Sequence, residues 1–321
     1  MFSLKCLIPG LCVFLLLGCK PNYPPNARPT LYTTISADGQ MVATLFNAGT
    51  EKQRLRVMRL DRADGWQDVQ APQFTQSIRF GLLGHELLLT HHLQEEKQDR
   101  LVKLDLDKQD SSPQTIYQDD ELGFPVEVSK GQVMVRTCPS KSSPGAHQCR
   151  MSGYRWKLIG PGKIISQVGP DSIGGWPAPN IVGTGFFWIE EQTGGSKDAH
   201  PLVMSYPFPG GYSPPFFREN LDKNTWTVDC DRQASRCLRR YISNLEKTGG
   251  GAFVYEVEVL FGAERCKLEG VAGTGDGVSI TPDGRAAVMS LAEAYDKPRH
   301  VAVMRFDPNR CQAASVQHIE I

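Results

Sequence analysis

The chain has 321 residues, with 35 basic and 35 acidic side chains and a formal net charge of zero. No run of lysine and arginine is interleaved with aromatic residues, so the composition does not predict a nucleic-acid partner. The 31 glycines and 22 prolines are many for a helical protein, and no apolar pattern of helical period continues beyond two turns after residue 19. These features predict an all-β protein.

The N-terminus carries an apolar segment, Cys6 to Leu17, behind a single basic side chain, Lys5. This segment is too short to span the roughly 30 Å of hydrocarbon in a bilayer, which indicates a cleaved signal. It ends in Leu16-Leu17-Gly18-Cys19, which resembles a bacterial lipoprotein signal peptide, although smaller or β-branched residues are commoner than leucine before the glycine. The resemblance implies removal of residues 1–18 and lipid attachment at Cys19. The alternative is an ordinary secretory signal in which Cys19 is incidental.

Residues 20–29 contain four prolines, which cannot donate to a β-ladder or continue a helix. We therefore expect residues 19–29 to be a lipid-anchored, proline-rich tether and residues 30–321 to be one body. The same resemblance implies attachment to the outer membrane on its periplasmic side, because Lys20 stands where an aspartate would favour the inner membrane.

One motif occurs near both ends of this body. Ile35 to Ala43 contains Asp38-Gly39 and is followed by Leu55 to Asp61, and Ile280 to Val288 contains Asp283-Gly284 and is followed by His300 to Asp307. An Asp-Gly pair between β-forming runs supplies the positive φ that a tight hairpin needs. Each copy is therefore predicted to be a strand, a turn, a second strand, a loop and a third strand.

Weaker copies lie between these two, and the fifth copy is irregular. The turn anchors are spaced by about 45 to 54 residues, the length that one four-stranded blade needs. These anchors are Gly39, Gly84, Gly131, Gly185, the region of Cys237, and Gly284. The Ser/Thr-x-Asp-Gly turn before a Val-Met-Arg strand resembles the blade repeat of the TolB-like β-propeller family. The resemblance implies a propeller of six blades of four antiparallel strands; two packed β-sandwiches are the alternative.

Six cysteines remain after Cys19, an even number that suggests disulfide bonds in an exported protein. We expect two local hairpin staples and one longer bond, although six cysteines allow 15 connectivities. Metal binding is a weaker reading, because no Cys-x-x-Cys spacing occurs and His147 is the only histidine close to a cysteine. The expected pairs are Cys138 with Cys149, Cys230 with Cys237, and Cys266 with Cys311.

No catalytic motif is present, and we assign no catalytic residue, cofactor or metal ligand. His91-His92 followed by Glu95-Glu96 could suggest a metal site, but adjacent side chains of a strand point to opposite faces, so we expect a solvated loop there. Acidic groups are plentiful, but none is singled out as a pair. They include Asp119-Asp120-Glu121, Glu190-Glu191, Asp229 and Asp231.

Two loops rich in proline and aromatic residues, 174–180 and 206–217, could form a binding face. Its candidate contact residues are Trp176, Tyr206, Phe208 and Tyr212, although these loops could instead only cap the propeller core. The sequence thus predicts a membrane-anchored periplasmic lipoprotein that is a non-catalytic scaffold or binding module for an envelope protein or peptide. The alternatives are a hydrolase or carbohydrate-binding protein with a site in the propeller channel, or a structural part of a surface assembly.

Overall fold

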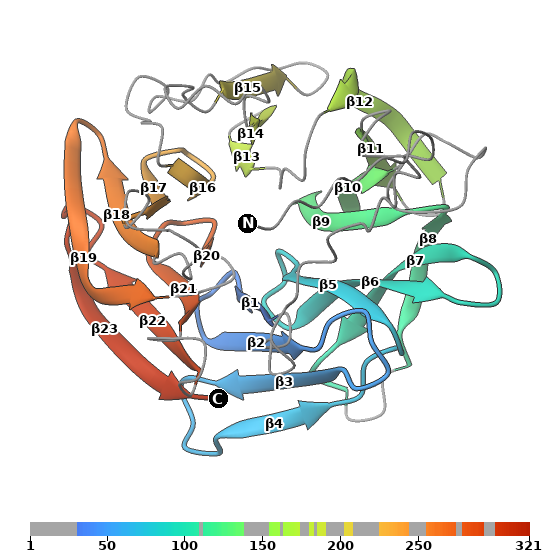
Figure 1. The fold of residues 1–321 in the computed structure, drawn as a ribbon, viewed down its shortest axis with the longest axis horizontal. Helices are drawn as coiled ribbons and strands as arrows, with labels where there is room; N and C mark the ends of the chain where they lie inside the picture. The colour runs from blue at the N-terminus through green and yellow to red at the C-terminus, as the bar shows by residue number, and fades with distance from the viewer. Residues whose placement is uncertain are drawn as a thin grey trace, which may run out of the picture.

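The computed structural model is a ring of antiparallel sheets that stand radially around a central axis (Figure 1). It describes residues 31–108, 112–137, 154–160, 163–173, 180–182, 185–190, 202–207, 225–243, 255–273, 278–291 and 299–321. The regular elements in these ranges are all strands, in agreement with the predicted all-β class. The described part of the chain contains no apolar helix of membrane-spanning length.

The described strands form five four-stranded sheets and one three-stranded sheet, which we number 1 to 6 in chain order. Each sheet is a meander in which every strand pairs with the next one along the chain. Sheet 1 contains β1 (Leu31–Ile35), β2 (Met41–Phe46), β3 (Arg54–Arg59) and β4 (Trp66–Val69). Sheet 2 contains β5 (Thr75–Phe80), β6 (Glu86–Leu93), β7 (Gln98–Asp105) and β8 (Gln114–Asp119). Sheet 3 contains β9 (Leu122–Ser129), β10 (Gln132–Thr137), β11 (Tyr154–Gly160) and β12 (Lys163–Ile173).

The second half of the ring has the same plan. Sheet 4 contains β13 (Asn180–Val182), β14 (Gly185–Glu190) and β15 (Leu202–Pro207). Sheet 5 contains β16 (Thr225–Cys230), β17 (Arg236–Ile242), β18 (Tyr255–Phe261) and β19 (Glu264–Gly273). Sheet 6 contains β20 (Val278–Ile280), β21 (Ala286–Leu291), β22 (His300–Phe306) and β23 (Ala313–Glu320). The first strand of each sheet lies innermost, so the molecule has the architecture of a β-propeller.

The predicted Asp-Gly turns join the first and second strands of sheets 1 and 6. In sheet 1, Gly39 has a φ of +70°, and its N–H donates to the carbonyl of Ser36 at 2.9 Å. The Ser36 hydroxyl accepts the N–H of Met41 at 2.8 Å, and Asp38 Oδ1 accepts the N–H of Gln40 at 3.0 Å. Thr281, Asp283 and Gly284 repeat these contacts in sheet 6. The aspartates of both turns therefore have the structural role that the sequence predicted.

Sheet 5 contains the same turn in a form that the sequence analysis missed. The Asp231 N–H donates to the carbonyl of Arg236 at 3.0 Å, as Ser36 does to Met41 in sheet 1. Asp231 Oδ2 accepts the N–H of Arg236 at 3.0 Å, and Oδ1 accepts that of Gln233, also at 3.0 Å. Ala234 takes the position of the glycine, with a φ of +53°. The Asp231 carboxylate thus accepts the backbone hydrogen bonds that Ser36 and Asp38 accept separately in sheet 1.

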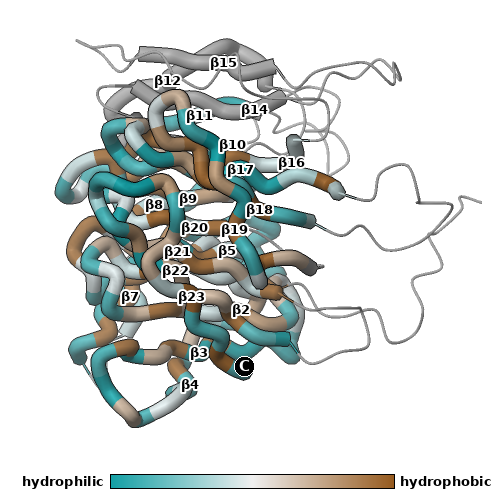
Figure 2. Tube along the Cα trace, turned by 90° about the vertical axis from the view of Figure 1, so that its left-hand side faces the viewer, coloured by the Kyte–Doolittle hydropathy of each residue, from teal (hydrophilic) through white to brown (hydrophobic). Residues whose placement is uncertain are grey.

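The core lies between the sheets, not inside any one of them, because successive side chains of a strand point to opposite faces. In β6, Leu87 and Leu89 face sheet 1, whereas Leu88 faces sheet 3. All three are at most 2% exposed. Figure 2 accordingly shows hydrophobic stretches of several residues within the strands. Stacking of neighbours buries both faces of a sheet that could bury neither face alone.

Sheets 6 and 1 close the ring through apolar contacts, and among the described residues they share no strand. We call this contact the 6/1 seam. One hydrogen bond crosses its outer edge, from Trp66 Nε1 to the carbonyl of Glu320 at 2.7 Å. Its buried residues are Ile35, Val42, Ala286, Val288, Val301 and Val303.

Sheets 5 and 6 make a contact of a different kind, which we call the 5/6 seam. A disulfide bond joins Cys266 on β19 to Cys311, which follows β22. The guanidinium of Arg236 donates to the carbonyls of Gly284, Asp307 and Arg310 at 2.6, 2.8 and 2.7 Å. It also lies between the rings of Phe261 and Phe306, at 4.8 and 4.7 Å from their centroids. The buried apolar residues of the 5/6 seam include Leu238, Val257, Val259, Met289, Ala302 and Met304.

Candidate functional site

The central channel is the site to which every sheet contributes. Its cavity has a volume of about 50 Å³ and is lined by the innermost strands and their turns. A single water needs roughly 10 to 15 Å³, so the cavity has room for a few waters or one small ion. The lining includes Ile35, Phe80, Val126, Ile181, Cys230 and Ile280, one residue from each innermost strand.

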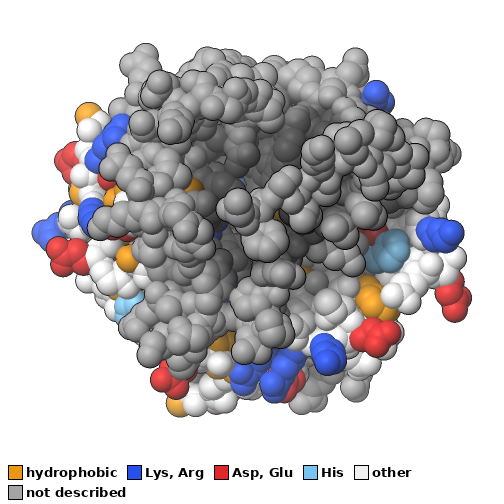
Figure 3. Space-filling view, viewed as in Figure 1, with side chains coloured by type: hydrophobic (Ala, Val, Ile, Leu, Met, Phe, Trp, Pro, Cys, Tyr) orange, Lys and Arg blue, Asp and Glu red, His pale blue; other side chains and the backbone are white. Residues whose placement is uncertain are grey.

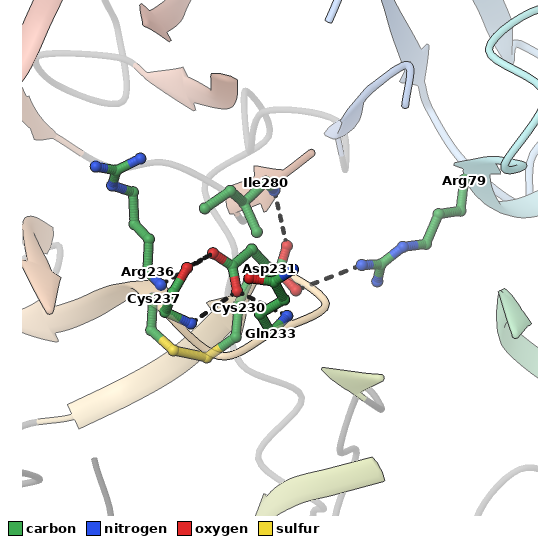
Figure 4. Close-up of a disulfide and its surroundings, with 9 residues drawn as sticks. Arg79, Cys230, Asp231, Gln233, Arg236, Cys237 and Ile280 are labelled. Carbon is green, nitrogen blue, oxygen red and sulfur yellow. Dashed lines mark hydrogen bonds and ion pairs between the residues drawn. A yellow bond between two sulfur atoms is a disulfide. The ribbon is translucent and has the colours of Figure 1, made fainter. Parts of the chain in front are cut away.

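An ion pair crosses the channel between sheets 2 and 5. Arg79 on β5 reaches toward the sheet 5 hairpin (Figure 4), and its Nη2 lies 3.3 Å from Asp229 Oδ1. Asp229 Oδ2 accepts the N–H of Ile280 at 2.9 Å. Burial raises the pKa of Asp229, and the charge of Arg79 is the largest opposing influence. Arg79 therefore helps to keep this buried carboxylate ionised.

A second arginine reaches across the channel from sheet 5 to sheet 3. Arg232 Nη1 donates to the carbonyl of Val128 at 3.0 Å, and Nη2 donates to the carbonyl of Glu127. Its backbone N–H donates to the carbonyl of Pro282 at 2.9 Å, so this one residue touches three sheets. The pKa of Arg232 is lowered to about 10, mainly by burial and also by the positive charge of Arg79, while the charge of Glu127 opposes the shift. The two guanidinium groups thus lie within electrostatic reach of each other.

Glu127 on β9 is the second carboxylate of the channel lining. Its Oε2 accepts the N–H of Leu82 at 2.6 Å, and its Oε1 accepts that of Gly131 at 2.9 Å. It thereby ties the turn of sheet 2 to the turn of its own sheet. Asp229 and Glu127 both stabilise the ring by accepting backbone N–H groups.

The prediction of a solvated loop at His91-His92 is wrong. Both residues belong to β6, and His91 is 8% exposed. His92 Nδ1 lies 2.7 Å from Asp99 Oδ1, because the two residues are directly opposite each other on β6 and β7. Asp99 is 1% exposed, and its Oδ2 accepts the N–H of Leu122 at 2.9 Å. The spacing of seven residues across a tight hairpin was the available signal for this pair.

The acidic run that precedes β9 has separate roles. Asp119 Oδ2 accepts the hydroxyl of Tyr117 at 2.9 Å and also contacts Lys157 Nζ on sheet 3. Burial raises the pKa of Glu121, while Arg136 opposes the rise. Asp119 therefore forms part of the contact between sheets 2 and 3, and the run does not act as a unit.

A histidine and two carboxylates approach one another at the turn end of sheet 2. The ligand atoms of His85, Asp105 and Asp107 lie within 4.8 Å of each other. Each carboxylate already has a cationic partner: Asp107 pairs with Arg59 at 2.6 Å, and Asp105 with Lys108 at 2.9 Å. These partners neutralise the cluster, so we do not assign it a metal.

Two predicted cysteine pairs are disulfides in the structure. Cys230 and Cys237 face each other in the ladder of β16 and β17 and are bonded, as are Cys266 and Cys311. The predicted pair of Cys138 and Cys149 lies outside the described residues, as do Cys19, Trp176, Phe208 and Tyr212. Tyr206 lies on β15, where only the backbone is described.

The face seen in Figure 3 carries its charged described side chains around the rim, with both signs interspersed. The described charges on this face do not form a single-sign patch. The channel is therefore the best-defined candidate site among the described residues.

No family model matches the sequence, and no curated protein matches it either. Solved structures do match. TolB from Acinetobacter baumannii aligns with a TM-score of 0.55 and 12% identity, over 88% of this chain and 67% of that one. The β-propeller domain of the Trilobed protease from Pyrococcus furiosus, described as having an open velcro topology, aligns with a TM-score of 0.53 and 11% identity, over 92% and 84%.

An acylaminoacyl peptidase from Pyrococcus horikoshii aligns with a TM-score of 0.54 and 10% identity, over 92% of this chain but only 46% of the peptidase. The chain thus spans less than half of that enzyme. At such low identities these likenesses establish the fold alone. They show that the chain adopts the β-propeller fold that TolB and the propeller domains of these peptidases share.

Proposed function

We propose that this chain is a lipid-anchored, extracytoplasmic β-propeller of six blades that acts as a non-catalytic binding scaffold for an envelope protein or peptide. Sheet 4 would be the fourth blade. Cys19 would carry the lipid, residues 19–29 would be the tether, and the propeller would lie on the periplasmic side of the outer membrane.

The two disulfide bonds support an oxidising compartment. Structural disulfides form and persist in secreted and periplasmic proteins and are rare in the cytosol. The Cys266–Cys311 bond joins two sheets 45 residues apart in sequence, so it is built into the ring and not confined to one loop. This agrees with the export that the N-terminal apolar segment predicts.

The braced channel is the observation that carries the scaffold assignment. Arg79 and Arg232 span it, and the cavity of about 50 Å³ is smaller than a sugar ring or a peptide would need. Contact with a macromolecule would therefore use surfaces outside the channel, and we keep Trp176, Tyr206, Phe208 and Tyr212 as the candidate contact residues.

Lipid attachment is tested by expressing the full chain in a bacterial host that is fed an alkyne-tagged fatty acid. We expect label on the wild type and on Cys12→Ala, whose changed cysteine lies in the cleaved segment, but none on Cys19→Ala. Mass spectrometry of the N-terminal peptide should place cleavage before residue 19. Label on Cys19→Ala, or a membrane-bound Cys19→Ala chain, would argue against this anchor.

The scaffold role is tested by crosslinking in the intact envelope followed by purification of the tagged chain. We expect one or more envelope proteins to be recovered in a defined ratio from the wild type. Recovery of no partner, together with turnover of a glycoside or ester substrate by the purified protein, would support the hydrolase alternative instead.

A further inference from the structure

The channel contains more hydrogen-bond donors than acceptors. A guanidinium carries five N–H groups, and the described residues offer Arg79 one acceptor, Asp229 Oδ1 at 3.3 Å. That distance is long for a bond between a guanidinium and a carboxylate, which is usually about 2.7 to 2.9 Å. The Arg79 side chain is 27% exposed and lines the cavity. Its remaining donors have no acceptor among the described residues, so they are available to water or to a small ligand.

The carboxylates of the channel do not accept hydrogen bonds from these remaining donors. Three of the four carboxylate oxygens of Asp229 and Glu127 accept backbone N–H groups, those of Ile280, Leu82 and Gly131. Only one oxygen receives a guanidinium. These carboxylates thus bond mainly with the backbone, which leaves most donors of Arg79 without a carboxylate partner among the described residues.

The second guanidinium also bonds to backbone groups. Arg232 gives its two terminal nitrogens to carbonyl oxygens and not to a carboxylate, although the charge of Glu127 acts on it from nearby. Arg232 and Arg79 line one cavity, and each raises the positive potential at the other. An acceptor-only ligand of small size would satisfy the free donors and reduce this repulsion.

We propose that the channel binds one small carboxylate, held by Arg79 and placed in the positive potential of Arg232. A carboxylate matches the planar donor fork of a guanidinium, and one of acetate size fits a cavity of about 50 Å³. Because the cavity is too small for a peptide, the carboxylate would belong to a free small metabolite. This site is independent of the lipid anchor and of any macromolecular partner.

The test is thermal unfolding of the full chain, purified with its disulfides intact, in increasing sodium acetate. Sodium gluconate, which is too large for the cavity, keeps the ionic strength constant. We expect Tm to rise with acetate and then saturate, because a ligand that binds only the folded state stabilises it. Arg79→Gln should lose the saturable rise. Arg59→Gln removes the same charge from a surface ion pair with Asp107 and should keep it.

A second variant is expected to bind acetate more tightly, an effect that misfolding could not produce. Asp229→Asn removes the negative charge beside Arg79 while keeping an acceptor, so the half-saturating acetate concentration should fall by about threefold or more.

A rise in Tm that does not saturate, or that is equal in the wild type and Arg79→Gln, would mean that the cavity holds only water, and the proposal would be wrong. The same result would leave the lipid anchor and the scaffold role untouched, because those are measured by labelling and crosslinking.

Discussion

The 5/6 seam and the 6/1 seam use different chemistry, although sheet 6 forms one side of both. The 5/6 seam has an apolar core, a disulfide bond and the three carbonyl contacts of Arg236. The 6/1 seam has a smaller set of buried side chains, mostly valine and alanine, and one exposed hydrogen bond from Trp66. Sheet 6 is thus cross-linked to the sheet before it and only packed against the first.

The difference indicates where the ring is weakest. Among the described residues no strand is shared across the 6/1 seam, so sheets 6 and 1 can separate without breaking a ladder hydrogen bond. The disulfide bond keeps sheets 5 and 6 tethered even when their contact opens. We therefore expect local opening at the 6/1 seam to require less free energy than opening at the 5/6 seam.

The largest expected effect comes from a charge in the 6/1 seam. Val301 is fully buried there, and Val301→Asp would place an unpaired carboxylate in an apolar contact. We expect a loss of about 5 kcal/mol in the free energy of unfolding, with faster hydrogen exchange in sheets 1 and 6 than in sheets 2 and 3. Leu83→Asp, at a turn residue that is 40% exposed, is the control and should change little. Equal exchange in all sheets would contradict a weak seam.

The next effect compares the two disulfides. The chain-entropy model predicts a loss of about 4 kcal/mol for Cys266→Ser with Cys311→Ser, which opens a loop of 45 residues. The same model predicts about 2 kcal/mol for Cys230→Ser with Cys237→Ser, whose separation is 7. Urea unfolding of both double variants measures the difference. If the longer cross-link stabilised the protein less than the shorter one, the 5/6 seam would not depend on its covalent bond.

Arg236 is the polar counterpart of that cross-link. Arg236→Met keeps much of the apolar contact with Phe261 and Phe306 but leaves three carbonyls of sheet 6 without their donor. We expect a loss of about 3 kcal/mol, measured by urea unfolding. Arg62→Met, at an exposed residue of the turn after β3, is the matched control and should cost little. A small effect of Arg236→Met would mean that water replaces the arginine without cost.

Local chemistry explains which parts of this architecture could be predicted from the sequence. The turns of sheets 1 and 6 could be, because the hydrogen bonds that Ser36, Asp38 and Gly39 make there lie within one hairpin. The equivalent turn of sheet 5 was missed because Asp231 alone accepts the N–H groups that two side chains accept elsewhere, and because Ala234 takes the left-handed position.

The channel and the seams could not be predicted from local patterns. Arg79 and Asp229 are 150 residues apart, and their pairing depends on sheets 2 and 5 facing each other across the axis. The same holds for Arg232 and its carbonyl acceptors in sheet 3. No spacing in the sequence encodes such contacts, since they follow from how many sheets close the ring and in which order they stack.

The two Asp-Gly turns allow a finer comparison of the seams. Each glycine has a positive φ, so Gly39→Ala and Gly284→Ala share a backbone cost of about 1 kcal/mol. A Cβ at Gly39 would meet the flexible end of Arg305 at 2.6 Å, which can move aside. At Gly284 it would meet Asp231 Oδ2 at 2.6 Å, an atom held by Ser235 and Arg236. We expect a loss of about 2 kcal/mol for Gly284→Ala and about 1 kcal/mol for Gly39→Ala in urea unfolding. Equal losses would mean that a Cβ at Gly284 is accommodated beside Asp231 as easily as a Cβ at Gly39 is accommodated beside Arg305.

The smallest expected effect has the opposite sign. Thr44 is fully buried on the face of β2 that Val42 presents to the 6/1 seam, and its hydroxyl has no partner among the described residues. Thr44→Val keeps the shape of the side chain and removes this unsatisfied group, so the free energy of unfolding should rise by about 1 kcal/mol. Thr34→Val is the control, because the Thr34 hydroxyl accepts the N–H of Phe80 at 3.4 Å and its loss should not stabilise. A destabilised Thr44→Val would indicate a bound water at this position, and the 6/1 seam would then be held by polar contacts as well as by packing.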